Sequence, residues 1–428
     1  MIALLFISLF VMIFLGMDLM LVLLFSCALV IVSSNIFYGS TIPYDVISQY
    51  VYGGIDSFTF TAIPLFILAG EIMNRGGITD KLIDFSNKLV GHIRGSIGQS
   101  SILLNMFMAG VSGSAVADTT ATGSVMIPAM KKEGYPPEKA AAIIAGSGTI
   151  GPVIPPSIPF IILGGIAEIS VGKLFLAGLI PGVIMGLFMM LYVYFYAKKI
   201  NLPKRDKASF KEVLNTTKRA ILPLGLPIII LGSIITGLAS PTESAVLGVL
   251  YALIVSTFVY RSINLKSLYH VLLEASLSSG LIMLIIGAGN LFGWVATYNS
   301  IGSLLEGILL SISSSMYVVL FIIVIMLIVM GCVIEVNPII LLVTPILYPI
   351  IIDLGVDPIH FGAIMIITLM TALLTPPVGL SLFITSSIAQ VPILSVARAA
   401  IPFWLIIVCV VVLVVLIPPL TLFLPSLL

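Results

Sequence analysis

The chain has 428 residues, of which 60% are hydrophobic and 9% are charged, and its formal net charge at pH 7 is +1. Soluble domains carry roughly 25% charged residues, so this composition excludes a soluble globular protein. The balanced charge gives no sign of nucleic-acid binding. Apolar runs of about 17–25 residues recur along the chain, each long enough to cross a bilayer core. They predict an all-α polytopic membrane protein.

The first half is expected to hold a broken N-terminal run, an interfacial helix and a helix hairpin. Residues 2–37 are apolar and interrupted at 16–18, and helical sequence returns near 58–73 after a polar stretch. Residues 75–95 alternate charged with apolar residues, which is typical of an amphipathic helix at the membrane interface, with a connecting loop as the alternative. Beyond them we expect a hairpin at about 97–128, a broken helix at about 140–167 and a clean span at 174–197.

A basic segment at 198–219 separates the halves and is expected in the cytoplasm, because basic loops remain on that side. The second half is expected to hold spans near 221–237, 243–260 and 276–298, a hairpin at about 317–350, a broken helix at about 361–390 and a last helix at 400–424. We therefore expect two repeats, 1–215 and 216–428, with about 11–12 membrane segments in total. The scaffold region and the transport region would each contain helices from both repeats.

One motif occurs in both halves. Residues 112–128 read SGSAVADTTATGSVMIP and residues 329–345 read VMGCVIEVNPIILLVTP. An offset of 217 (335 minus 118) aligns Asp118 with Glu335, whereas two Pro-Pro pairs align at 221 (376 minus 155), so the second copy would hold about four extra residues. Helix breaks inside a membrane are tolerated only where the backbone lines an enclosed cavity. Paired breaks therefore predict the substrate and ion site of a secondary transporter.

The loops that follow the two hairpins differ in charge. Residues 131–139 carry three lysines, whereas residues 353–358 carry two aspartates and neither lysine nor arginine. Under the positive-inside rule, these loops lie on opposite sides of the membrane. The repeats are therefore predicted to be inverted about an axis in the membrane plane.

The two motifs offer oxygen ligands and carboxylates, but no cationic side chain. Serine hydroxyls, and carbonyls left unpaired near glycine and proline, suit a hard cation such as Na+. The helix starts after each break present amides and partial positive charge to a substrate carboxylate. Asp118 and Glu335 are functional candidates because of their depth. Either they couple cations and organise the site, or they support the hairpins by capping and hydrogen bonding.

Two further glutamates, Glu71 and Glu243, stand in apolar sequence. Residues 240–243 read Ser-Pro-Thr-Glu, which is typical of a helix N-cap followed by an acid in the first turn, so Glu243 is interpreted as structural. The sequence contains no GxxxxGK[ST] loop and no catalytic constellation. We therefore expect neither ATP hydrolysis nor an enzyme.

Taken in order, these segments resemble the large membrane subunit (M subunit) of TRAP transporters, the tripartite ATP-independent periplasmic transporters. The resemblance covers nearly the whole chain and is carried by residues 63–78, 112–128, 148–160, 240–252 and 374–383. It implies an elevator-type carrier of the bacterial inner membrane, with inverted repeats and re-entrant hairpins, coupled to two or more Na+ ions. It also implies a small four-helix subunit as a separate partner chain, and a periplasmic binding protein that delivers an organic acid.

The resemblance also implies site residues. The first sodium site would use Ser112, Gly113, Ser114, Gly151, Val153 and Pro155, and the second would use Gly331, Ile334, Thr375, Pro376 and Gly379. Substrate binding and site organisation would involve Asp118, Glu335, Ser157, Pro156 and Pro377. The chain looks nearest to the sialic-acid branch, followed by carriers of C4-dicarboxylates or other carboxylates. A stand-alone divalent-anion/sodium symporter of the same architecture is the alternative function.

Overall fold

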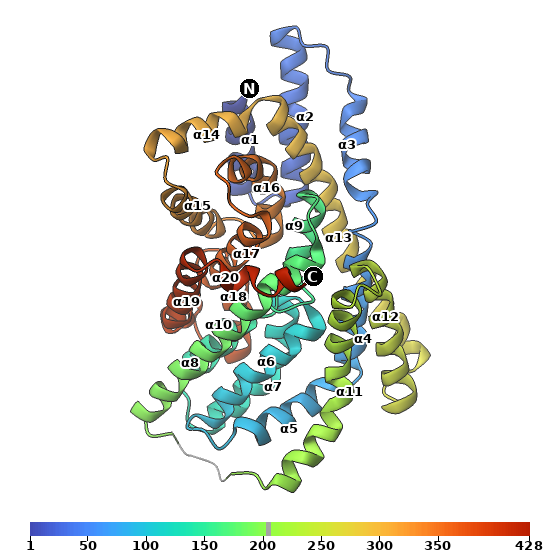
Figure 1. Cartoon of the computed structure of the whole chain (residues 1–428), viewed down its shortest axis with the longest axis vertical. Coiled ribbons are helices and arrows are strands. Elements are labelled where there is room, and N and C mark those ends of the chain that lie inside the picture. The colour runs from blue at the N-terminus through green and yellow to red at the C-terminus, as the bar shows by residue number, and fades with distance from the viewer. Residues whose placement is uncertain (203–206) are drawn as a thin grey trace.

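The computed structural model describes residues 1–202 and 207–428, and every regular element within them is a helix (Figure 1). The predicted basic linker at 198–219 is therefore described only in part, since Lys204, Arg205 and Asp206 lie outside the described residues. The all-helical expectation is confirmed.

The first half contains the predicted breaks and one additional helix. Its elements are α1 (Ile2–Phe14), α2 (Leu19–Tyr38), α3 (Asp45–Ile55), α4 (Ala62–Arg75), α5 (Ile78–Val90), α6 (Ser96–Ser112), α7 (Ala115–Lys132), α8 (Pro137–Gly148), α9 (Ile158–Ile166) and α10 (Val171–Lys199). The N-terminal run breaks before α2 because the side chain of Asp18 accepts a hydrogen bond from the backbone N–H of Met20, which caps that helix. Helix α3 occupies the polar stretch for which the sequence predicted no helix.

The second half follows the same order. Its elements are α11 (Phe210–Ile235), α12 (Pro241–Ile254) with the π-helical turn η1 (Val255–Val259), α13 (Leu265–Tyr298), α14 (Ile301–Ile312), α15 (Met316–Gly331), α16 (Val336–Asp353), α17 (Pro358–Leu369) with the 3-10 turn η2 (Met370–Leu374), α18 (Leu380–Ala389), α19 (Ile393–Leu416), α20 (Pro419–Leu422) and the 3-10 turn η3 (Pro425–Leu427). Glu243 completes a capping box with Ser240 at the start of α12, as predicted.

Seven helices in the described part of the chain are long and apolar enough to cross a membrane. They are α2, α10, α11, α12 together with η1, α13, α16 and α19. Shorter apolar helices are α1, α14, α15, α18 and the α17–η2 unit. This set identifies a polytopic membrane protein.

Two pairs of helices repeat between the halves at the same offset. Helices α7 and α16 have 18 residues each and begin at positions 115 and 336, and α8 and α17 have 12 residues each and begin at positions 137 and 358. The offset is 221 for both pairs (336 minus 115 and 358 minus 137), so the expected hairpin offset of 217 is wrong. Glu335 corresponds to Ser114, because each is the N-cap of the helix that leaves its hairpin tip, and Asp118 corresponds to Ile339. The offset of 217 aligned Pro128 with Pro345, whereas the offset of 221 aligns it with Pro349. Helix α16 holds both prolines, one turn apart, so the sequence alone fitted either alignment.

The helices from α6 to α10 pack among those from α16 to α19, so the two halves share one body. Helix α18 lies against α7 and α8, α9 lies against α16, and α19 lies against α8 and α10. The buried Lys139 of α8 ties three of these helices, since its Nζ donates to the Tyr192 hydroxyl of α10 (2.9 Å) and to the Ala399 carbonyl of α19 (2.7 Å). Around this body, α13 packs on α2, α3 and α4, and α11 packs on α5 and α12.

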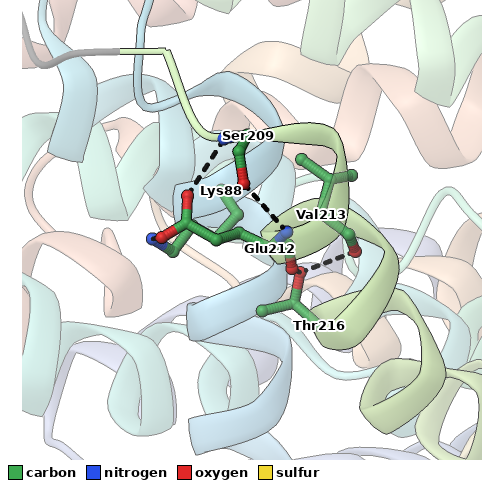
Figure 2. A network of polar contacts seen from close by, with 5 residues as sticks. All are labelled: Lys88, Ser209, Glu212, Val213 and Thr216. Carbon is green, nitrogen blue, oxygen red and sulfur yellow. Dashed lines mark hydrogen bonds and ion pairs between the residues drawn. The ribbon is translucent and has the colours of Figure 1, made fainter.

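The basic linker leads into a capped helix that is joined to α5. Ser209 and Glu212 form a reciprocal capping box at the start of α11. The Lys88 Nζ of α5 lies 3.4 Å from Glu212 Oε1. Figure 2 shows these two side chains at the start of α11. The predicted amphipathic segment is a helix, and it packs on the first helix of the second half with this exposed ion pair at the contact.

Candidate functional site

The first hairpin tip is made by Gly113 and Ser114. Gly113 ends α6 in the left-handed conformation (φ +62°), which glycine adopts at no steric cost. The Ser114 side chain then accepts from the backbone N–H of Ala117 and caps α7. The chain reverses within these two residues, so the amides at the start of α7 lie at the tip.

The tip presses against the break between α8 and α9. A Cβ on Gly113 would lie 2.3 Å from the Pro156 carbonyl oxygen, and a Cβ on Gly151 would lie 2.6 Å from Asp118 Oδ2. Only glycine permits these approaches at either position. The structure thus brings the two predicted segments of the first sodium site into direct contact.

Asp118 is fully buried behind the tip. The Ser112 hydroxyl donates to its Oδ1 at 2.6 Å, and also lies 3.1 Å from the backbone N of Ser114. Asp118 Oδ2 and the hydroxyl of the adjacent Thr119 are buried and have no hydrogen-bond partner among the described residues. Buried polar atoms are normally satisfied, so each of these two oxygens is available to a cation or a water molecule.

The other predicted residues of the first break have different surroundings. The Ser157 side chain caps α9 by accepting from the Phe160 N–H, and donates to the Pro152 carbonyl. The Val153 carbonyl faces α10, where a Cβ on Gly178 would lie 2.3 Å from it. Ser157 therefore stabilises the break. Among the residues predicted for the first sodium site, Val153 has its carbonyl packed against α10.

The second tip is less polar. Glu335 is the N-cap of α16 and is exposed, and its side chain makes no capping hydrogen bond. A Cβ on Gly331 would lie 2.7 Å from that of Ala372, so the end of α15 packs tightly on η2. Ile334 lines a separate apolar cavity of about 260 Å³ that also involves α1 and α14.

The second break contains Thr375, Pro376, Pro377 and Gly379. The Thr375 hydroxyl donates to the Thr371 carbonyl (2.7 Å), and the Thr375 carbonyl accepts from the Gly379 N–H (3.1 Å). Pro376 and Pro377 are exposed. Of the five predicted residues of the second sodium site, only Thr375 offers a side-chain oxygen.

A central cavity of about 120 Å³ collects the starts of four helices. The residues that line this cavity include the first residues of α7, α9, α16 and α18. They are Ser114 and Ala115 for α7, Ile158 and Pro159 for α9, Glu335 to Asn337 for α16, and Leu380 for α18. Each helix start carries partial positive charge. The amides of its first turn have no intrahelical partner, but Ser114 accepts from the Ala117 N–H, Ser157 accepts from the Phe160 N–H, and Pro159 has no N–H. The cavity is therefore suited to an anionic group, although no lysine, arginine or histidine of the described chain lines it.

A second cavity of about 410 Å³, called the vestibule below, adjoins the central one. Both are lined by Ser114, Val116, Ile158 and Ile282. The vestibule adds polar side chains from three helices: Glu71 and Asn74 of α4, Thr120 of α7 and Ser278 of α13. The sequence assigned no role to these residues. Its one signal was an acid, Glu71, within apolar sequence.

A comparison with known protein families decides the identity. Residues 4–420 match the family model described as the DctM component of tripartite ATP-independent periplasmic transporters. The chain belongs to the DctM family. It is therefore the large permease of a TRAP transporter, a multi-pass protein of the bacterial inner membrane and not an enzyme.

Relatives with different named substrates are about equally similar to this permease. The chain is 38% identical to the 2,3-diketo-L-gulonate TRAP large permease of Escherichia coli, over 88% of each chain. It is 37% identical to the sialic acid TRAP large permease of Vibrio cholerae, over 89% of each. It is 39% identical to the C4-dicarboxylate TRAP large permease of Pseudomonas aeruginosa, over 87% of each. Identity alone does not select a substrate.

Two further similarities concern the partner and the fold. The chain is 35% identical to the isethionate TRAP permease DctMQ of Oleidesulfovibrio alaskensis and spans 62% of that fused protein. Large permeases of this family work with a small membrane subunit and a periplasmic component. Among solved structures, the YdaH transporter of Alcanivorax borkumensis has the same fold, with a TM-score of 0.62 over 87% of each chain at 14% identity.

Proposed function

We propose that this permease imports an organic acid with Na+, from a periplasmic binding protein, by an elevator mechanism. The observation that carries the proposal is the meeting of four helix starts at one central cavity. A carboxylate there would accept amide hydrogen bonds and gain from the helix dipoles without an arginine. N-acetylneuraminate is the first substrate to test, and C4-dicarboxylates and other carboxylates come next.

The first sodium site is proposed at the contact between the first tip and the first break. Ser112, Gly113, Ser114, Gly151, Val153 and Pro155 would supply carbonyl or hydroxyl oxygens. Asp118 Oδ2 and the Thr119 hydroxyl, which have no hydrogen-bond partner among the described residues, would add buried oxygens. Oxygen donors of this kind suit a hard cation. The cation would balance the buried charge of Asp118, which is costly to leave unpaired.

The second sodium site is proposed at Gly331, Ile334, Thr375, Pro376 and Gly379. Its ligands would be mainly backbone carbonyls, because Thr375 supplies the single side-chain oxygen of this set. Glu335 lies at the adjoining central cavity, where a neighbouring cation would offset its charge.

The transport cycle is proposed to use two inverted repeats, 1–215 and 216–428, with about 11–12 membrane segments. The constant offset between helices of equal length supports the repeat, and the opposite charge of the loops after α7 and α16 supports the inversion. The moving part would be the body formed by the two hairpins and the two broken helices. The surrounding helices would form its scaffold.

The stand-alone symporter is the weaker alternative, since the DctM model describes a component of a tripartite system. Proteoliposomes that contain this permease and its small partner subunit distinguish the two functions. Uptake of labelled acid should require both external Na+ and the binding protein. Uptake that continues with choline in place of Na+ would refute sodium coupling, and uptake without the binding protein would favour the symporter.

A further inference from the structure

The vestibule extends the central cavity along α7. Ser114 lines both cavities, and Thr120 and Ala121 line the vestibule alone. At a rise of 1.5 Å per residue, the six positions from Ser114 to Thr120 span roughly 9 Å. A substrate with its carboxylate at the helix starts therefore has room for its remaining atoms in the vestibule.

The vestibule offers hydrogen-bonding groups from three directions. Glu71 and Asn74 come from α4, Thr120 from α7 and Ser278 from α13. Asn74 Oδ1 is buried and has no hydrogen-bond partner in the part of the chain that the structure describes. Carboxylate and amide oxygens accept from hydroxyl groups, and the amide nitrogen of Asn74 donates. These groups suit a chain of hydroxyls or amides.

The charges around the two cavities limit what else can bind there. No residue lining the vestibule in the described chain is lysine, arginine or histidine, and Arg75, next to Asn74, is paired with Glu274 at 2.6 Å. A second carboxylate in the vestibule would lie beside Glu71, and no cationic side chain among the lining residues of the described chain would offset the repulsion.

We propose that the vestibule is a subsite for the hydroxyl-bearing part of a monocarboxylate, and that Glu71 is a specificity-determining residue that excludes dicarboxylates. The inference rests on the proposed function, because it concerns the same transport pathway. Glu71 accepts hydrogen bonds from substrate hydroxyls and repels a second carboxylate. The substrate class is thus a polyhydroxylated monocarboxylic acid.

Ligand-induced thermal stabilisation of the purified permease with its small partner subunit tests this assignment. The ligands are D-gluconate and N-acetylneuraminate on one side, and succinate and fumarate on the other, each with Na+ and with choline. In the unmodified protein with Na+, at least one of the two hydroxylated monocarboxylates should raise the melting temperature, and neither dicarboxylate should raise it. In Glu71→Gln its apparent Kd should rise by about tenfold or more, since hydrogen bonds to a charged acceptor are lost. Glu71→Gln should also become stabilised by succinate.

Glu306→Gln is the matched control, because Glu306 lies in α14 and lines neither cavity. Three results would overturn the inference: stabilisation of the unmodified protein by a dicarboxylate, no stabilisation by either hydroxylated acid, or an unchanged ligand preference in Glu71→Gln. Na+-dependent uptake of succinate would refute the inference and leave the proposed function intact. Uptake of every acid independent of Na+ would instead refute the sodium coupling.

Discussion

Asp118 distinguishes the first half of the site from the second. One of its oxygens accepts from Ser112, and the other is buried without a partner among the described residues. The corresponding position in the second half is Ile339, and Ser112 corresponds to Val333. A buried carboxylate and the serine that holds it thus occur in one half only. Of the two proposed sodium sites, we therefore expect the first to bind more strongly.

Removal of the Asp118 charge distinguishes a role in cation coupling and site organisation from a role in hairpin support. Asp118→Asn and Ser112→Ala should raise the Na+ concentration for half-maximal uptake by about tenfold, since a hydrogen bond to a charged group contributes roughly 1.5–3 kcal/mol. Expression should be largely unaffected. The measurement is initial uptake against Na+ concentration.

Ser124→Ala, which removes an exposed hydroxyl of the same helix, is the control for these variants. The hairpin-support interpretation makes the opposite prediction. It holds if Asp118→Asn transports at normal Na+ concentrations but melts at a lower temperature.

Gly151 tests the contact between tip and break. An alanine Cβ would approach Asp118 Oδ2 to 2.6 Å, closer than real Cβ contacts allow, so the carboxylate must move. We expect Gly151→Ala to lose most Na+-dependent uptake and to lower the melting temperature. Gly232→Ala is the control, since a Cβ in that helical position meets nothing within 4 Å and alanine favours a helix by about 1 kcal/mol over glycine. Equal behaviour of the two variants would argue against the contact.

At the scale of elements, α8 is anchored by a lysine. Lys139 is buried and donates to α10 and α19, on opposite halves of the chain. Its counterpart at the same offset in the second half, His360 of α17, contacts the Thr421 hydroxyl of α20 at 2.6 Å. Both broken helices are therefore fixed near their outer ends and have their breaks at the cavity.

Lys139→Met keeps the length of the side chain and removes both hydrogen bonds. We expect a loss of about 1–3 kcal/mol in the free energy of unfolding, the usual cost of leaving buried partners unsatisfied. Scanning fluorimetry in detergent should show a lower melting temperature than for Lys132→Met, which changes an exposed lysine in the same region. Identical melting curves would show that the lysine does not anchor α8.

The sequence predicted most elements because glycine, proline and serine mark the breaks of a membrane chain clearly. It missed α3, which is polar, and α14, which is too short for a span. It could not give the correct offset for the hairpins, since two prolines one turn apart fit almost equally well. Nor could it predict the vestibule, because α4, α7 and α13 meet only through packing of distant segments.

At the scale of the whole molecule, the inverted arrangement is open to a labelling test. Single cysteines are introduced by Lys132→Cys and by Asp353→Cys, at exposed positions that end α7 and α16, after replacement of Cys27, Cys332 and Cys409. A membrane-impermeant maleimide should label the first only from the cytoplasmic side and the second only from the periplasmic side. Labelling of both from one side would exclude inversion.

The offset shared by these two helix pairs also bears on the origin of the chain. Helices α7 and α16 are equal in length, as are α8 and α17, and both pairs begin 221 residues apart, so one arm of the hairpin and one arm of the broken helix have the same length in both halves. Duplication of a half-length ancestor that inserted in both orientations, followed by fusion, would leave such a pattern. The two tips now differ in their side chains: the first has the buried Asp118 and Ser112, and the second has Ile339 and Val333 at the corresponding positions.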